Sequence, residues 1–291
     1  MTGNKTNMKT VLITGINGFL GSNLAKRLSV AYKIIGTEYT LNSLHRIGGL
    51  GFKIYEADEA SIKRVFIENG IDIIIHTATF YGRNNEDFEK LFNSNLLSAF
   101  SLLELSVKNK CDLFINTDTA LERYTSAYAL TKRQFYDWLF FRSSEIKVAN
   151  MQLEHFYGGG ASPTNFISLM IRKLLNNEQK IDLTLGEQRR DFVYYEDVID
   201  AFELVIQRSQ NLEQRFNSFE IASGEIISIH DLMLLLKELT RSKAYLNFGA
   251  IPYRENELMI SSYNLEPIFK FGWKAKTVLK DGLVKTINEI K

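Results

Sequence analysis

The first half of the chain alternates short apolar runs with stretches in which apolar residues recur every three to four positions. The runs predict buried strands at 10–14, 32–37, 52–56, 72–76, 113–116 and 147–151. Helical spacing predicts helices at 19–30, 61–69, 88–108 and 127–141. Because strands that alternate with helices form parallel sheets with helices on both faces, we expect an α/β fold built on a doubly wound parallel sheet.

After residue 151 this alternation breaks. Gly158-Gly159-Gly160 and the nearby Pro163 mark a loop. Helices are expected at 165–176, 195–207, 229–240 and 277–290, with short strands at 182–184, 216–221 and 245–248. We therefore expect a first domain over 1–151 and a smaller C-terminal α/β lobe over 152–291, interleaved with it and binding substrate at the carboxyl ends of the sheet.

Composition narrows the class of protein. The chain has 291 residues, 45% of them hydrophobic, and its 35 Lys+Arg against 34 Asp+Glu leave a formal net charge of +1. Such balance argues against a nucleic-acid or membrane partner. One cysteine, Cys111, suits a reducing compartment, and residues 1–9 do not form a signal peptide, so we expect a cytoplasmic protein. No Cys/His cluster has metal-ligand spacing, so no metal is expected.

A glycine-rich turn follows the first strand and opens the first helix. Gly15, Gly18 and Gly21 provide the tight turn and the close backbone approach that a pyrophosphate on a helix N-terminus requires. This is the arrangement of a Rossmann-type NAD(P)-binding domain. Residues of the turn that we expect at the cofactor, besides Gly15 and Gly18, are Asn17, Phe19 and Leu20.

Two acids follow the next strands. Glu38 lies about 20 residues beyond the glycines, where a carboxylate accepts hydrogen bonds from the adenosine ribose and repels a 2′-phosphate. It therefore favours NAD(H), while His45 and Arg46 just downstream keep NADP(H) as the alternative. Asp58 is placed either to reach the adenine amine or to cap the helix that follows.

Tyr128 and Lys132 lie four residues apart, on one face of the helix expected at 127–141. The ammonium is expected to lower the pKa of the phenol from its usual value of about 10, which makes Tyr128 a proton donor and acceptor near neutral pH. The pair is a weak pattern alone. Behind a dinucleotide turn it indicates a nicotinamide enzyme that moves a hydride and a proton at one carbon. His76 is expected to be buried and hydrogen-bonded rather than catalytic.

With His76-Thr77-Ala78, Asn95 and the segment 186–198, these residues resemble the extended short-chain dehydrogenase/reductase family, also called the NAD-dependent epimerase/dehydratase family, over nearly the whole chain. Segments 114–119, 153–155, 186–188 and 248–259 resemble the nucleotide-sugar 4-ketoreductases of the CDP-abequose/CDP-paratose synthase group. The resemblance implies NAD(P)H-dependent reduction of the C4 carbonyl of a nucleotide-activated 6-deoxy or 3,6-dideoxy 4-keto sugar, in the biosynthesis of surface polysaccharides such as lipopolysaccharide O-antigen. That group is associated with NADPH, which departs from the preference that Glu38 favours.

The resemblance also assigns roles. Thr119, with Thr117 as the fallback, would hydrogen-bond the substrate oxygen beside Tyr128 and Lys132, and Arg190 would hold the diphosphate unless it pairs with Asp191 or Glu196. Further residues expected at the cofactor are Ala78, Asn95 and Lys132. Residues expected at the substrate are Thr79, Tyr81, Thr119, His155, Arg190 and Arg254.

Alternatives remain open. A 4,6-dehydratase of the family carries an Asp-Glu pair where this chain has Ala120-Leu121, with Glu122 one place further on, so dehydration is disfavoured. A nucleotide-sugar 4-epimerase with tightly bound NAD uses the same Tyr–Lys pair. A non-catalytic cofactor sensor would not need the intact set of hydroxyls and lysine. Family members commonly form homodimers through two helices, which here are those near 90–108 and 127–142.

Overall fold

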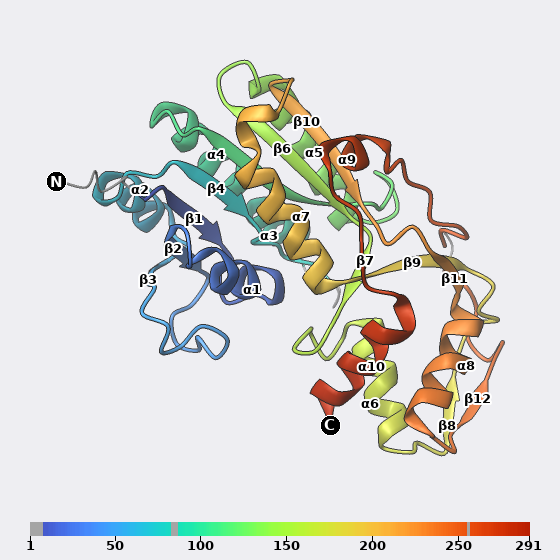
Figure 1. The fold of residues 1–291 in the computed structure, drawn as a ribbon. Helices are drawn as coiled ribbons and strands as arrows, with labels where there is room; N and C mark the ends of the chain where they lie inside the picture. The colour runs from blue at the N-terminus through green and yellow to red at the C-terminus, as the bar shows by residue number, and fades with distance from the viewer. Residues whose placement is uncertain (1–7, 83–86, 255–256) are drawn as a thin grey trace, which may run out of the picture. The chain divides into compact units, whose positions relative to one another are not determined.

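The computed structural model describes residues 8–82, 87–254 and 257–291 (Figure 1). The chain folds into two compact units. The first comprises Met1–Gln152 and Phe202–Phe219, and the second comprises Leu153–Ala201 and Glu220–Lys291. The chain therefore leaves the first unit after its sixth strand and later returns to it.

Within the described residues, the first unit is built on a seven-stranded sheet of order β10-β6-β5-β4-β1-β2-β3. Its strands are β1 (Thr10–Thr14), β2 (Lys33–Glu38), β3 (Lys53–Glu56), β4 (Ile73–His76), β5 (Leu113–Thr119), β6 (Lys147–Leu153) and β10 (Phe216–Ile221). β1 pairs in parallel with both β2 and β4, so the strand order reverses between β1 and β4. Such a switch point is where open α/β sheets bind ligands. The doubly wound fold class predicted from the sequence is confirmed.

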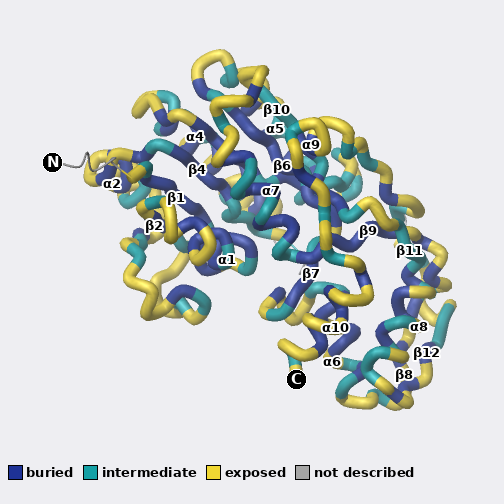
Figure 2. Tube along the Cα trace, viewed as in Figure 1, coloured by how far each residue is buried: buried dark blue, intermediate teal, exposed yellow. Residues whose placement is uncertain are grey.

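Helices flank this sheet, and a hydrophobic core lies where they pack against it. They are α1 (Phe19–Leu28), α2 (Glu59–Glu68), α3 (Phe88–Phe92), η1 (Asn93–Leu97), α4 (Ser98–Lys108), α5 (Ala127–Arg142) and η2 (Ser209–Asn211), with α7 (Tyr195–Gln207) running into the unit. Leu12 and Ile74 of the sheet pack in one cluster with Leu103 of α4 and with Phe135 and Leu139 of α5. Figure 2 shows β1 and β4 as continuously buried.

The helix expected over 88–108 contains a π-helical turn, η1, between α3 and α4. A π turn adds one residue to the helical repeat and frequently marks a functional position. Here the extra residue places Asn95, which is 2% exposed, against the strand-end loop at Phe80. Apolar spacing predicts the helix but does not reveal the added residue.

The second unit holds smaller sheets of order β11-β9-β7 and β12-β8. Its strands are β7 (His155–Tyr157), β8 (Lys180–Asp182), β9 (Arg189–Tyr194), β11 (Ile226–Ser228) and β12 (Tyr245–Asn247), and its helices are α6 (Phe166–Leu175), α8 (Ile229–Thr240), α9 (Glu266–Phe271) and α10 (Leu279–Ile290). A core forms among α6, α8 and α10, with Ile171, Leu236 and Leu283 fully buried.

Several of these elements differ from the expectation. β7, β11 and α9 were not predicted, because three-residue strands and a six-residue helix are too short to show a period. The six-residue strand β9 was also not predicted, because its residues are buried on both faces and do not alternate between polar and apolar. Segment 216–221 was predicted as a strand among those of the second half. It is β10, which extends the seven-stranded sheet beside β6. Local pattern predicts that a strand exists but not which strand it pairs with.

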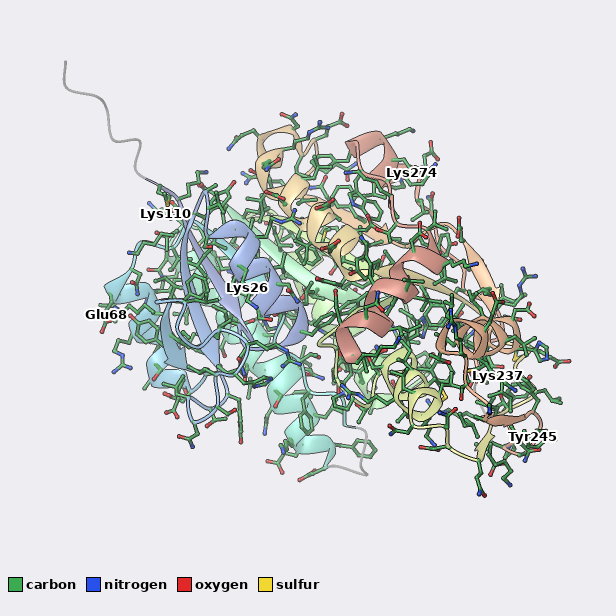
Figure 3. All side chains as sticks on the ribbon, turned by 60° about the horizontal axis from the view of Figure 1, so that its bottom comes forward. Lys26, Glu68, Lys110, Lys237, Tyr245 and Lys274 are labelled. Atoms are coloured by element: carbon green, nitrogen blue, oxygen red, sulfur yellow. The ribbon has the colours of Figure 1, made fainter. Side chains whose placement is uncertain are left out.

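Charged side chains such as Lys26, Glu68 and Lys110 project from the surface of the first unit (Figure 3). None of the helices in the described part of the chain has the length and apolar content that crossing a bilayer requires.

Candidate active site

The glycine turn lies at the switch point between β1 and β4. Gly15 has a φ of +65°, and a Cβ on it would lie 2.9 Å from the Cα of Ala78, which follows β4. A Cβ on Gly21 would lie 2.3 Å from the carbonyl oxygen of Gly15. The turn closes with the Gly18 N–H donating to that same carbonyl at 2.9 Å. Gly15 and Gly21 are therefore required for packing as well as for approach to a ligand.

Helix α1 begins at this turn with its dipole uncompensated. Gly18 is its N-cap, no side chain caps it, and its first turn carries no acidic residue. A helix N-terminus of this kind favours an anionic group. The turn and helix thus fit the pyrophosphate of a dinucleotide. Phe19 and Leu20 begin α1, and Ala78 packs against Gly15 of the turn.

Glu38 ends β2 beside the turn. Its carboxylate accepts hydrogen bonds from the backbone N–H of Asn17 at 2.8 Å and of Tyr39 at 3.0 Å. The Asn17 amide in turn donates to the Ser43 carbonyl, and its oxygen accepts from the Arg46 N–H. Asn17 therefore organises the loop that follows β2, where the Glu38 carboxylate and the Arg46 guanidinium both contact its backbone.

Asp58 caps α2, because its carboxylate accepts a hydrogen bond from the Ser61 N–H at 2.8 Å. This is the second of the two roles considered for it from the sequence. The Ser61 hydroxyl and then the Ser61 N–H lower the pKa of Asp58.

Tyr128 meets several hydroxyl groups at the carboxyl end of β5. The hydroxyls of Thr79 and Thr119 lie near its phenol and act to lower its pKa, and its ring lies 5.1 Å, centroid to centroid, from that of Tyr81. Thr119 is the last residue of β5, and its hydroxyl also accepts from the Leu121 N–H at 3.2 Å. The structure thus brings together the predicted catalytic Tyr128 and Thr119 with the two predicted substrate residues of the loop after β4.

The expected lowering of the Tyr128 pKa by Lys132 is wrong for this structure. Burial and the nearby Tyr81 and Asp118 raise the pKa of Tyr128, opposed by its hydrogen bonds to the two threonines. The Lys132 ammonium instead donates to the carbonyl oxygen of Thr117 at 2.8 Å. Sequence spacing places both side chains on one helix face but does not determine which acceptor the ammonium chooses.

Lys132 is 2% exposed, and burial lowers its pKa to about 8, an effect that Asp118 opposes. His76, at the end of β4, is 4% exposed and hydrogen-bonds the Thr14 hydroxyl at 2.8 Å, as predicted. Burial and the Lys132 charge lower the pKa of His76 to about 3. His76 is therefore neutral at physiological pH.

Asn95, which is expected from the sequence at the cofactor, is hydrogen-bonded within the protein. Its amide donates to the Phe80 carbonyl at 2.8 Å and to the Thr131 hydroxyl at 3.3 Å, while its oxygen accepts from the Phe80 N–H at 2.8 Å. Both amide hydrogens are thereby used within the protein. Asn95 connects the loop after β4 to α5, which fixes the position of Thr79 and Tyr81 relative to Tyr128.

The remaining predicted substrate residues lie in the second unit. Arg190, on β9, is 7% exposed and donates to Glu257 at 2.6 Å, rather than to either acid near it in sequence. Arg254 is exposed. His155, on β7, hydrogen-bonds the buried carboxylate of Glu154 at 3.2 Å. Two of these three residues are therefore paired with an acid.

Sequence reasoning missed two ion pairs at or beside predicted residues. Glu257 pairs with Arg190 across 67 positions. Asp118 and Arg133, which stand directly beside Thr119 and Lys132 in sequence, contact each other. The adjacency to catalytic positions was the one available signal for the second pair.

A dinucleotide turn at the switch point of a doubly wound sheet, with a Tyr–Lys helix and a threonine at the end of β5, defines a class of nicotinamide-dependent oxidoreductases and epimerases. Residues 11–222 match the model of the NAD dependent epimerase/dehydratase family. The chain belongs to that family, and it is an NAD-dependent enzyme.

Comparison with individual proteins gives more distant likenesses. The chain is 26% identical to a CDP-abequose synthase of Salmonella typhimurium, over 96% of this chain and 98% of that protein, and 29% identical to one of Salmonella muenchen, over 96% and 97%. Among solved structures, a UDP-glucuronic acid 4-epimerase from Bacillus cereus superposes with a TM-score of 0.86 at 21% identity, over 97% of this chain and 98% of that one. The structural likeness supports the fold.

Proposed function

We propose that the protein reduces the C4 carbonyl of a nucleotide-activated 4-keto-6-deoxy or 3,6-dideoxy sugar, using NAD(P)H. The observation that carries the proposal is the group of hydroxyls around Tyr128, with Thr119 beside it and Lys132 behind it. The similarity to CDP-abequose synthases supports a sugar of this kind, destined for a surface polysaccharide such as O-antigen.

A reduced nicotinamide supplies the hydride for this chemistry. The chain contributes the proton and the geometry: the Thr119 hydroxyl donates to the substrate oxygen, and the Tyr128 phenol gives that oxygen its proton as charge develops. The raised pKa of Tyr128 keeps the phenol protonated at neutral pH, which suits a proton donor in the reductive direction. Arg190 and Arg254 would bind the nucleotide diphosphate, because guanidinium groups pair bidentately with phosphate. His155 would contact the sugar.

The same residues support reduction better than dehydration. Positions 120 and 121 are Ala and Leu, and Glu122 is exposed. Asp118, the acid next to Thr119, is held by Arg133 and by the Asn150 amide. An elimination across C5 and C6 needs an acid and a base at the substrate, and these positions supply neither. The family includes epimerases, so a 4-epimerase is the second candidate.

The test combines purified protein, NADH or NADPH, and a 4-keto-6-deoxy sugar linked to CDP, dTDP or GDP. We expect stoichiometric oxidation of the cofactor with one of these substrates. Tyr128→Phe should lower the rate by about 10²–10⁴-fold, the usual contribution of a general acid. Tyr124→Phe, at a phenol that is 80% exposed, is the matched control and should retain full activity. Inversion at C4 of an ordinary nucleotide hexose with no net cofactor use would refute the reductase and support the epimerase.

We also propose a homodimer formed through η1, α4 and α5. Phe135 and Leu139 of α5 are fully buried in the core, whereas Trp138 and Phe141 of the same helix are 43% and 72% exposed. An apolar patch of this kind is typical of an interface. Sedimentation should show a dimer that Phe141→Glu converts to a monomer. Tyr245→Glu, on β12 at a side chain that is 62% exposed, should leave the dimer intact.

A further inference from the structure

Asp118 and Arg133 stand immediately beside Thr119 and Lys132 in sequence. Because side chains alternate along a strand, Asp118 lies on the opposite face of β5 from Thr119. The Asp118 carboxylate is 3% exposed. It meets the guanidinium of Arg133, which follows Lys132 on α5, at 3.5 Å. The Asp118–Arg133 pair therefore connects β5 to α5, in addition to the hydrogen bond from Lys132 to Thr117.

The partners of Asp118 favour the ionised form of its carboxylate. It accepts hydrogen bonds from the Thr119 N–H at 2.8 Å and from the Asn150 amide at 3.0 Å, in addition to Arg133. The Asn150 amide is itself oriented, because its oxygen accepts from the Asn116 amide at 2.7 Å. Each of these partners donates, so a proton on the carboxyl would face a donor. Burial raises the pKa of Asp118, and Arg133, Asn150 and the Thr119 N–H oppose that rise.

Arg133 also contacts the backbone that presents the catalytic threonine. Its second terminal nitrogen donates to the carbonyl oxygens of Thr119 and Leu121, both at 3.3 Å. The turn between these carbonyls is the one in which the Leu121 N–H donates to the Thr119 hydroxyl. A planar guanidinium can donate to one carboxylate and two carbonyls at once in fixed directions. A lysine ammonium has fewer donors, and they rotate, so it would fix the positions of these acceptors less well.

The Lys132 ammonium donates to the carbonyl oxygen of Thr117, the residue before Asp118, at 2.8 Å, which places the lysine charge beside the segment that carries the carboxylate. Burial disfavours the charged form of Lys132, and the charge of Asp118 favours it. Asn150 of β6, which donates to Asp118, and Ser218 of β10, whose hydroxyl accepts from the Asn150 amide, are uncharged. The titratable and charged groups that face Asp118 or Lys132 are Tyr128, Arg133 and Tyr136 of α5 and His76 of β4.

We propose that Asp118 and Arg133 are a pair of positioning residues for the reaction: Arg133 fixes the backbone that carries Thr119, and Asp118 keeps Lys132 charged. The proposal deepens the function proposed above and rests on it for its kinetic predictions. Neither residue touches the reacting atoms.

The first experiment removes the negative charge at position 118 and keeps the size and shape of the side chain. Asp118→Asn should lower the pKa of Lys132 by about one unit, the scale of one nearby opposite charge. We would measure this pKa by NMR titration of lysine labelled at Cε, with the resonance assigned by its absence in Lys132→Arg. The alkaline limb of the kcat profile should move to lower pH by the same amount. Asp137→Asn removes an exposed acid of the same helix, paired with Arg123 at 2.8 Å, and should change neither quantity. An unchanged Lys132 pKa in folded Asp118→Asn would overturn the electrostatic half of the proposal.

The second experiment keeps the positive charge at position 133 and removes the planar guanidinium. Arg133→Lys should leave the pKa of Lys132 near its wild-type value and lower kcat by about 10²-fold with little change in KM, because a small displacement of a catalytic group costs this much. Wild-type kcat in Arg133→Lys would overturn the positioning half. If Asp118→Asn does not fold, Arg133→Lys still tests the positioning role. Asn150→Ala, which removes one donor to Asp118, then replaces Asp118→Asn in the titration, and we expect it to lower the pKa of Lys132.

The two levels of the proposal separate cleanly. If the wild-type protein turns over no 4-keto sugar, the proposed function fails, whereas the Lys132 titration still tests the action of Asp118. If the wild type is active, Asp118→Asn leaves both the Lys132 pKa and the pH profile unchanged, and Arg133→Lys keeps wild-type kcat, then the positioning pair fails and the proposed function stands.

Discussion

His76 makes stability depend on pH in a way that can be measured. Its pKa in the folded protein is about 3, whereas an exposed histidine in the unfolded chain has a pKa of about 6.5. At pH 7 both states are neutral and nothing is lost. Below pH 6.5 the unfolded state takes up a proton that the folded state does not accept until about pH 3. Folding is therefore weakened progressively over that window.

The magnitude follows from the two pKa values. At pH 5 the difference of about 1.5 units between pH and the unfolded pKa, at 1.36 kcal/mol each, gives a loss of about 2 kcal/mol. A domain has about 5–15 kcal/mol in total, so the loss is large enough to resolve. His76→Asn keeps a group that can bond the Thr14 hydroxyl and has no proton to gain, so its stability should lack this dependence.

The assay is amide hydrogen exchange in β1 and β4, corrected for the intrinsic effect of pH on exchange, because it reports the opening of this sheet irrespective of the second unit. Between pH 7 and pH 5 the wild type should lose about 2 kcal/mol more than His76→Asn. His45→Asn, at an exposed histidine, should follow the wild type. Parallel losses in wild type and His76→Asn would show that His76 takes up its proton without unfolding, and would refute the reasoning.

Three further predictions concern the same unit. Gly21→Ala places a Cβ against the Gly15 carbonyl and should cost about 1–3 kcal/mol and weaken NADH binding by calorimetry, whereas Gly70→Ala, with open space, should cost nothing. Glu38→Gln should raise the ratio of kcat/KM for NADPH to that for NADH by about tenfold, since a charge beside the 2′-position is removed; an unchanged ratio would exclude Glu38 as the selector. Lys132→Met should abolish turnover and raise the thermal midpoint, because a buried charge disappears; a lowered midpoint would contradict this.

The parts of the site that could be predicted are those whose chemistry is local. The glycine turn and the Tyr–Lys spacing each lie within one loop or one helix, so sequence spacing fixes their geometry. Thr119 is an intermediate case. The strand was predicted to end at Asn116, and β5 continues to Thr119 because its polar residues are buried in a hydrogen-bonded network. Apolar pattern fails at such a strand, and functional sites are where this failure is expected.

The parts that could not be predicted depend on pairings distant in sequence. Asn95 reaches Phe80 through a π turn, Arg190 finds Glu257 rather than a neighbouring acid, and β10 joins a sheet formed by the first half of the chain. In each case the residue types permit several partners of equal chemical quality. Only the tertiary arrangement selects one, and periodicity carries no information about it.

Two basic side chains, His76 and Lys132, are buried beside the sheet, and their burial costs different amounts of folding free energy. His76 is neutral at pH 7 in both folded and unfolded states, so its burial costs little there. Lys132 has a pKa of about 8 and remains mostly charged, so moving it from an unfolded pKa of about 10.4 costs about 3 kcal/mol. A methionine would avoid that cost, which means that packing alone does not account for a lysine here. Asp118 reduces the cost without removing it, and a buried ammonium held charged at this position is what a site that handles a proton requires.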